Sequence, residues 1–306
     1  DWGKAEIVKP AFTGVKVLND YPLEELAKYI DWSPFFSTWE MSGTYPRIFE
    51  SDKYGKEARK VFDDAQALLK KAIAGKWISA NAVFGIFQAN SDNEYIEVYD
   101  ESGKIKTVFH QMRQQTKKQN GQANLCLADF VSPKGKEDYI GAFAVTAGLG
   151  IEKKLAEFEK DHDDYNSIML KALADRLAEA FAERLHERVR REFWGYAKDE
   201  HLSGEELIQE KYTGIRPAPG YPACPDHTEK PLIWQLLEVE KNTGIKLTES
   251  NAMYPAASVS GWYFANPEVK YFGVGKIQKD QVEQLAKVKG LTLPEMERWL
   301  NPNLGY

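Results

Sequence analysis

The sequence predicts an α+β fold, in which strands and helices occupy separate stretches of the chain. Strand-like segments cluster between residues 78 and 147 and recur between 257 and 275, with a long helical pattern between the two groups. The turns between the early strands are short, which favours antiparallel neighbours. This order differs from the regular strand–helix alternation of a parallel sheet.

Two helical segments precede the early strands. Residues 22–30 form a short amphipathic pattern that runs into an aromatic turn at residues 31–36. Residues 54–74 carry apolar side chains at intervals of three and four, which predicts a long helix. The segments that then alternate or are continuously apolar, and are predicted as strands, are 78–88, 95–99, 105–109 and 140–147.

The strongest helical pattern covers about residues 163–195. Apolar side chains recur every four residues from Tyr165 to Phe193. The segment begins with aspartates and ends with arginines, which matches the helix dipole, and Gly195 is a stop signal. After a proline-rich loop, the sequence predicts a helix at 230–241, strands at 257–264 and 270–275, and helices at 278–289 and 293–300.

The composition is that of a globular protein. The chain has 306 residues, which suits one large domain or two of common size, and neither an internal repeat nor a low-complexity linker divides it. No apolar run reaches the roughly 18 residues that a membrane helix needs. A net charge of −6 argues weakly against nucleic acid as a partner. The start lacks Met and a signal peptide, so we expect a piece of a longer protein.

Common catalytic motifs are absent from the sequence. It contains no nucleotide-phosphate loop, zinc-protease helix or nucleophile elbow, and its five histidines lack metal-ligand spacing. Cys126 and Cys224 lie far apart, so neither a disulfide framework nor a zinc knuckle is expected, and a reducing cytoplasm fits. The missing phosphate loop disfavours phosphate ligands and leaves a nucleoside without phosphates open.

Residues 214–225 form the most distinctive segment. Four prolines in this stretch fix φ and remove backbone donors, which predicts a stiff, extended loop. Arg216 would present a planar fork suited to a carboxylate, and Gly220 would allow a close backbone approach. The alternative is a structural loop whose arginine pairs with a local acid, and the residue types leave both interpretations open.

Other candidates also have two interpretations. Asp31 is either a turn acid or a carboxylate for a ligand cation. Glu179 and Glu210 are either solvated or part of a site, and the Tyr271–Phe272 pair is either core or site. Carboxylates, an arginine and aromatic rings together suit a zwitterion that carries an aromatic base, such as an amino acid joined to a nucleoside.

Several of these segments also carry a resemblance to a known family. The chain resembles the C-terminal reactivation domain of cobalamin-dependent methionine synthase over essentially its whole length, and the Arg-Pro-Ala-x-Gly-Tyr motif at 216–221 is the most specific part. The segments that carry the resemblance are 30–36, 127–131, 171–180, 214–225, 258–264 and 303–306.

The resemblance implies a fold and an activity. It implies one C-shaped α+β domain over residues 1–306, built around a twisted antiparallel sheet, which binds S-adenosylmethionine in an extended groove. The parent enzyme is the methyltransferase that passes methyl from methyltetrahydrofolate to homocysteine through cobalamin. When the cofactor oxidises to cob(II)alamin, one electron from a flavodoxin-type donor and a methyl group from S-adenosylmethionine restore it.

The resemblance also implies which residues form the site. Arg216 would hold the methionine carboxylate, and Asp31 would bind a polar group of the methionine or ribose portion. The remaining implied contacts are Ala218, Gly220, Tyr221, Tyr271, Phe272, Glu179 and Glu210. A methyl sulfonium carries its own leaving group, so the domain needs neither a general base nor a metal site and acts by positioning the methyl over cobalamin held by another domain of the enzyme.

Two other functions are weighed against this one. The chain could be a module that senses S-adenosylmethionine, or a docking scaffold, without methyl transfer. A free-standing methyltransferase is disfavoured because the usual Gly-rich loop and ribose acid are missing. Since flavodoxins are usually acidic and this chain is net negative, docking would need a local basic face. The candidates for it are Arg184, Arg188, Arg190 and Arg191, or Lys117 and Lys118.

Overall fold

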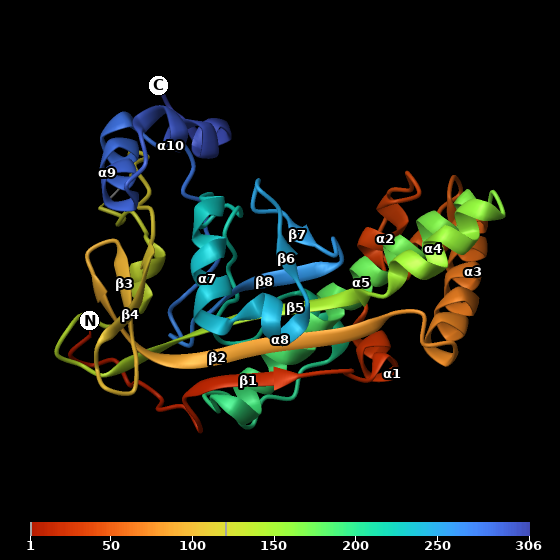
Figure 1. The fold of residues 1–306 in the computed structure, drawn as a ribbon, viewed down its shortest axis with the longest axis horizontal. Helices are drawn as coiled ribbons and strands as arrows, with labels where there is room; N and C mark the ends of the chain where they lie inside the picture. The colour runs from red at the N-terminus through yellow and green to blue at the C-terminus, as the bar shows by residue number, and fades with distance from the viewer. Residues whose placement is uncertain (1, 120) are drawn as a thin grey trace.

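An antiparallel sheet runs through the middle of the structure, a computed structural model that describes residues 2–119 and 121–306 (Figure 1). The long strand β2 lies inside it and pairs with β5 along one edge, while β1 and β3 share its other edge. In sheet order the strands are β4 (Ile105–His110), β3 (Tyr95–Tyr99), β2 (Ser79–Asp92), β5 (Asp138–Leu149) and β8 (Ser258–Tyr263), with β1 (Gly14–Leu18) beside the first half of β2.

Both faces of the sheet are covered, which explains why β5 is buried along almost its whole length. Alternate side chains of β5 enter different cores: Phe143 and Val145 pack in one, and Ala142 and Ala144 in the other. The first core contains the apolar sides of α3 (Gly55–Ala74) and α5 (Asp164–Arg188), and the second contains α7 (Lys230–Leu237).

The long helix confirms the pattern at 163–195. The Asp163 carboxylate accepts a hydrogen bond from the backbone N–H of Asn166 and so caps the start of α5. The helix continues into a π-helical turn at Val189–Phe193 and ends there, two residues before Gly195, where φ is +83°. The π-helical turn is the part of this helix that apolar spacing does not reveal.

Three predicted elements differ from the structure. Residues 33–36 of the predicted aromatic turn belong to a short helix, α2 (Ser33–Ser37). The predicted helix at 230–241 is two helices, α7 and α8 (Val239–Thr243), because Glu238 between them is left-handed, with φ +47°. The segment at 270–275 is not a strand.

The sheet edge explains this last error. The free side of β8 is filled by the segment around Ile215, which pairs with Phe264. Residues 270–275 therefore have no strand to pair with on that side, although their apolar alternation is strand-like. The sequence also did not predict β1 or α4 (Ile151–Lys160).

The remaining elements are short or lie at the ends of the sheet. Helices α9 (Lys279–Lys289) and α10 (Leu293–Leu300) form a small third core at one end, while α3 and α4 stand at the other end (Figure 1). The other short elements are α1 (Leu23–Leu26), α6 (Gly204–Ile208), β6 (Lys246–Leu247) and β7 (Met253–Tyr254). Across residues 2–119 and 121–306, no helix combines the length and the apolar character that crossing a membrane requires.

Candidate ligand-binding site

The loop that carries Arg216 lies along the outer edge of β8. Ile215 and Phe264 exchange two backbone hydrogen bonds, of 3.1 and 3.0 Å, and the N–H of Trp262 donates to the carbonyl of Pro217 at 2.9 Å. The backbone of the loop comes so close to β8 that a Cβ on Gly261 would lie 2.5 Å from the Pro217 carbonyl oxygen. The loop is therefore extended here, as its prolines predict, and the sheet fixes where Arg216 starts.

Beyond Pro217 the loop folds back on itself. The N–H of Tyr221 donates to the Ala218 carbonyl at 3.2 Å, and the N–H of Gly220 donates to the Cys224 carbonyl at 2.7 Å. Gly220 has φ +89°, and a Cβ there would lie 2.2 Å from the ring of His227. Glycine is thus required at this position by the turn and by the packing of His227.

The Arg216 side chain is held by three neighbours. Its Nη1 donates to the Tyr212 hydroxyl at 2.9 Å and lies 3.2 Å from Nδ1 of His186, while Nη2 lies 2.8 Å from a carboxylate oxygen of Glu183. Burial by itself would lower the pKa of Arg216, but the Glu183 carboxylate and the nearby tyrosines outweigh it and raise the pKa. The guanidinium therefore stays charged, with its side chain 18% exposed.

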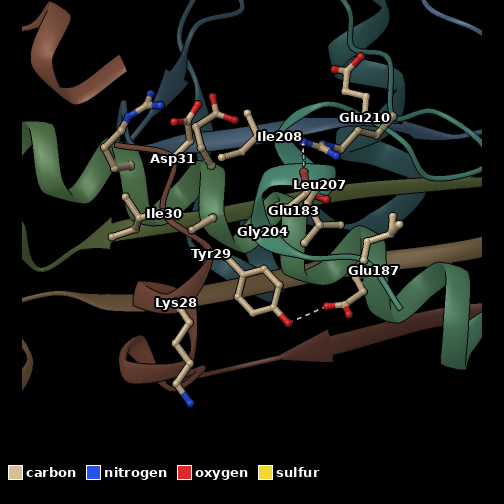
Figure 2. Close-up of a pocket in the computed structure, with 15 residues that line it drawn as sticks. Lys28, Tyr29, Ile30, Asp31, Glu183, Glu187, Gly204, Leu207, Ile208 and Glu210 are labelled. Atoms are coloured by element: carbon tan, nitrogen blue, oxygen red, sulfur yellow. Dashed lines mark hydrogen bonds and ion pairs between the residues drawn. The ribbon is translucent and has the colours of Figure 1, made fainter. Parts of the chain in front are cut away.

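A cleft of about 420 Å³ opens beside Arg216 (Figure 2). One side is formed by the chain just before α2, the other by α6 and the residues after it, and α5 lies between them. The lining contains five carboxylates and three cationic side chains: Asp31, Glu179, Glu183, Glu187 and Glu210, with Lys28, Arg176 and Arg216. This excess of acids makes the cleft suitable for a ligand that carries positive charge.

Two of these carboxylates, the half-buried Glu179 and the more exposed Glu210, are harder to ionise than a free carboxyl. Burial raises the pKa of both Glu179 and Glu210, and the neighbouring arginines only partly oppose it. A ligand cation close to them would stabilise the ionised form. The lining of the cleft thus contains both the charged guanidinium of Arg216 and two carboxylates whose ionisation a cation would favour.

The family model described as "Vitamin B12 dependent methionine synthase, activation domain" matches residues 22–290 of the chain. The chain belongs to this family. A solved structure titled "Crystal Structure of the MetH Reactivation Domain bound to AdoHcy" is 57% identical in sequence, and the two structures superpose with a TM-score of 0.96. The match covers 100% of this chain and 95% of the chain in that structure.

The activation domain brings four of the predicted site residues to the cleft. Asp31, Glu179, Glu210 and Arg216 all line it. Asp31 also accepts a hydrogen bond from the backbone N–H of Ser33 at 2.9 Å, so its role as a turn acid is present in the structure. One of its oxygens remains for another partner.

The other predicted residues lie outside this lining. The Tyr271 hydroxyl accepts a 3.1 Å hydrogen bond from the backbone N–H of Arg216, which places Tyr271 against the loop. Tyr221 is 61% exposed, and Phe272 packs partly between the second and third cores. Ala218 and Gly220 form the turn described above, and their contact with a ligand remains a prediction.

Three contact residues of Arg216 were not predicted from the sequence of this activation domain. Glu183 lies one helical turn after Glu179, and His186 nearly one turn further, so the three share a side of α5. This spacing was a usable signal, because two acids and a histidine recur on the side of α5 that Arg216 faces. Tyr212 gave no comparable signal.

The predicted basic docking face at the end of the long helix is wrong for Arg190. Its side chain is fully buried and pairs with Glu200 at 2.6 Å. Arg184, Arg188 and Arg191 are also engaged, in ion pairs with Glu25, Glu192 and Glu187 respectively. The second candidate, Lys117 with Lys118, stays a prediction: Lys117 is exposed, and Lys118 donates to Gln114.

Proposed function

We propose that this activation domain binds S-adenosylmethionine in the cleft beside Arg216 and positions its methyl group for the reductive methylation of cobalamin. The observation that carries the proposal is a charged guanidinium with unused donors at the wall of a cleft rich in carboxylates. The bound molecule named for the solved relative, AdoHcy, is what S-adenosylmethionine becomes when it loses its methyl.

The parts of the proposed ligand fit the chemistry of the cleft. The ligand's carboxylate suits the fork of Arg216, because planar bidentate pairing favours arginine over other cations. Its ammonium and sulfonium groups are cationic and suit Asp31, Glu179 and Glu210. The adenosine would lie along the loop at Ala218–Tyr221, where Tyr221, Tyr271 and Phe272 offer aromatic surfaces.

The chain's residues would act by binding and orientation. When a sulfonium gives up its methyl group, the leaving group is a neutral thioether. No side chain therefore has to donate or remove a proton. Holding the carboxylate and the cationic groups at fixed points directs the methyl towards an acceptor docked over the groove. Cobalamin, held by another domain of the enzyme, supplies that acceptor and receives a methyl cation and one electron.

The proposed partners are the domain that holds the methyl acceptor and the protein that supplies the electron. A cobalamin-binding domain of the same enzyme would dock over the groove, and a flavodoxin-type protein would supply the electron in the cytoplasm. The product of the cycle is an active methionine synthase, which serves methionine biosynthesis. The isolated activation domain does not turn over alone, because the methyl acceptor is bound elsewhere.

Transfer of labelled methyl tests the proposal. The chain is mixed with a cobalamin-loaded domain, a one-electron reductant and S-adenosylmethionine labelled in its methyl group. We expect label on the cobalamin with the wild type and with Arg59→Ala, an exposed arginine on α3 outside the cleft. Arg216→Ala should abolish the transfer. Binding without any transfer would instead favour the sensing or docking module.

A further inference from the structure

We propose that His186 is a positioning residue for this site, and that it orients Arg216 so that two adjacent donors of the guanidinium face the cleft. The inference rests on the proposed function, since it concerns the arginine that would hold the ligand's carboxylate. His186 does not line the cleft itself and is fully buried on α5.

The donors of Arg216 can be accounted for one by one. A guanidinium carries five N–H groups, two on each Nη and one on Nε. Both donors of Nη1 are used, by Tyr212 and by Nδ1 of His186, and one donor of Nη2 is directed at Glu183. Among the residues that the structure describes, Nε of Arg216 has no hydrogen-bond partner.

The unused donors are therefore one on Nε and one on Nη2. They lie on adjacent nitrogens, the arrangement that a carboxylate needs for a two-point contact. If Nη1 were released, the guanidinium could rotate about its last side-chain bonds, and the pair would no longer have a fixed direction. The two acceptors of Nη1 thus decide which donors the ligand meets.

The His186 ring is held firmly enough to act as such an acceptor. It stacks on the ring of Tyr263 at 5.2 Å and 13°, and Tyr263 in turn stacks on Phe143 at 4.6 Å and 15°. The ring of Tyr212 meets it edge-on at 4.9 Å. This stack ties the imidazole on α5 to strands β5 and β8, the same sheet that positions the Arg216 loop.

The proton of the imidazole has a clear place. Nδ1 faces Arg216, which has only donors, so Nδ1 must accept, and the proton belongs on Nε2, 3.5 Å from the Tyr196 hydroxyl. A protonated ring would turn an N–H towards the guanidinium and break the contact.

The surroundings of His186 favour the neutral ring. Burial, and then the charges of Arg190 on its own helix and Arg216 on the loop, hold its pKa well below the usual value. Two acids lie close to these arginines: Glu183 on α5 is engaged by Arg216, and Glu200 pairs with Arg190. The rings of Tyr212 and Tyr263 and the hydroxyl of Tyr196 also face the imidazole. Protonation of His186 should accordingly not change the affinity for the ligand between pH 6 and 8.

Two amide variants test the role of Nδ1. In His186→Asn the amide oxygen can occupy the place of Nδ1, whereas in His186→Gln the amide reaches the place of Nε2, away from Arg216. We expect His186→Asn to bind S-adenosylmethionine within about threefold of the wild type, and His186→Gln to bind about tenfold more weakly, the effect of losing a hydrogen bond to a charged group. Equal affinities for the two variants would overturn the proposal, because a role in packing alone would not distinguish them.

Measurements without ligand separate this inference from the proposed function. Nitrogen NMR of the ligand-free chain should show His186 neutral, with the proton on Nε2, and slow rotation of the Arg216 guanidinium. Tyr212→Phe, which removes the other Nη1 acceptor but keeps the ring, should speed that rotation as His186→Gln does. A proton on Nδ1, or unchanged rotation in both variants, would contradict the inference even if the wild type binds the ligand. If the wild type fails to bind while these signals are present, the proposed function fails and the positioning role stands.

Discussion

The direction of the Arg216 side chain is set by residues from two distant parts of the chain. Glu183 and His186 come from α5, and Tyr212 comes from the segment that leads into the loop. Such an arrangement gives the ligand a fork that is already ordered, so less conformational entropy is lost on binding. It also makes the guanidinium hard to replace.

Arg216→Lys should therefore weaken binding although it keeps the charge. An ammonium is a compact point charge and cannot contact Tyr212, His186, Glu183 and a bidentate carboxylate together. We expect S-adenosylmethionine affinity to fall by about ten- to a hundredfold, which corresponds to about 1.4–2.7 kcal/mol. Calorimetric titration measures it, with Arg59→Lys as the control; wild-type affinity in Arg216→Lys would show that the fork is not used.

Asp138, at the start of β5, should make stability depend on pH. Burial raises the pKa of its carboxyl from 3.8 to about 6, although the backbone N–H groups of Ser132 and Tyr139 oppose the shift. The folded chain thus holds this proton more tightly than the unfolded chain, so stability contributed by the neutral acid is lost as the pH rises from about 4 to about 6.

Comparison with Asp138→Asn isolates this effect. As the pH rises through that window, the wild type should lose up to about 3 kcal/mol of unfolding free energy relative to the variant, and the difference should be constant above pH 7. Urea unfolding at a series of pH values measures it. A difference that grows in the opposite direction would mean that the ionised carboxylate is the favoured form in the fold.

At this scale the sequence predicted part of the site. Asp31, Glu179, Glu210 and Arg216 were expected from residue type and resemblance, and they do line one cleft. The helical spacing of Glu183 and His186 after Glu179 was a signal for a shared side of α5, but it did not say that Arg216 would meet them, because which acceptor an arginine meets depends on side-chain directions set by tertiary packing. The same reason explains Arg190, whose charge suggested a surface although the side chain is buried.

At the scale of elements, β8 connects the core to the site. One of its edges pairs with β5, from Gly141 to Thr146, and the other receives the Ile215–Pro217 segment. The loop thus acts as a short extra strand whose position is set by backbone hydrogen bonds. Glycine at 261 lets the two backbones come this close.

Gly261→Ala should displace the loop. A Cβ at this position would lie 2.5 Å from the Pro217 carbonyl oxygen, and backbone cannot move aside as cheaply as a flexible side chain. We expect a loss of about 1–3 kcal/mol in unfolding free energy and weaker ligand binding, as for overpacking elsewhere. Thermal unfolding and titration measure the two effects.

Gly273→Ala is a matched control for that change. A Cβ there would make an ordinary contact, 3.6 Å from Pro222, so both stability and binding should stay close to the wild type. If Gly261→Ala behaved like this control, the close approach of loop and strand would not be needed to place Arg216.

Some sequence patterns were sufficient to predict a helix or strand, and others were not. The helix at 55–74 and the strand at 95–99 were predicted almost to the residue, and the long helix, predicted at about 163–195, runs from 164 to 193 when its π-helical turn is included. Long or strictly periodic patterns succeed because they reflect burial on one or two faces. The strand predicted at 270–275 does not form, because a strand needs a free sheet edge to pair with and the outer edge of β8 is already occupied by the segment around Ile215. That information is tertiary and is absent from a local pattern.

At the scale of the whole molecule, a buried ionic cluster ties the C-terminal helices to the rest. Lys289, at the end of α9, pairs with Asp226 at 2.6 Å and with Glu229, beside the start of α7. Both carboxylates are fully buried, and Glu229 also accepts from the backbone of His110. The cluster joins the third core to the segment that follows the proline-rich loop.

Lys289→Met should destabilise the fold. It removes the charge that pairs two buried carboxylates, and leaving such charges unpaired costs about 3–5 kcal/mol. Lys287→Met, at an exposed position two residues earlier on the same helix, should change stability by less than about 0.5 kcal/mol. Denaturant unfolding compares the two, and equal stabilities would mean that the cluster does not hold the C-terminal helices in place.

The central claim is that Arg216 and the acidic cleft form the S-adenosylmethionine site, and calorimetric titration of the chain tests it most directly. The account predicts saturable one-to-one binding by the wild type, unchanged in Arg59→Ala and at least tenfold weaker in Arg216→Ala, whose fold is checked by circular dichroism. Binding of equal strength in a folded Arg216→Ala variant, or no binding by the folded wild type, would contradict it.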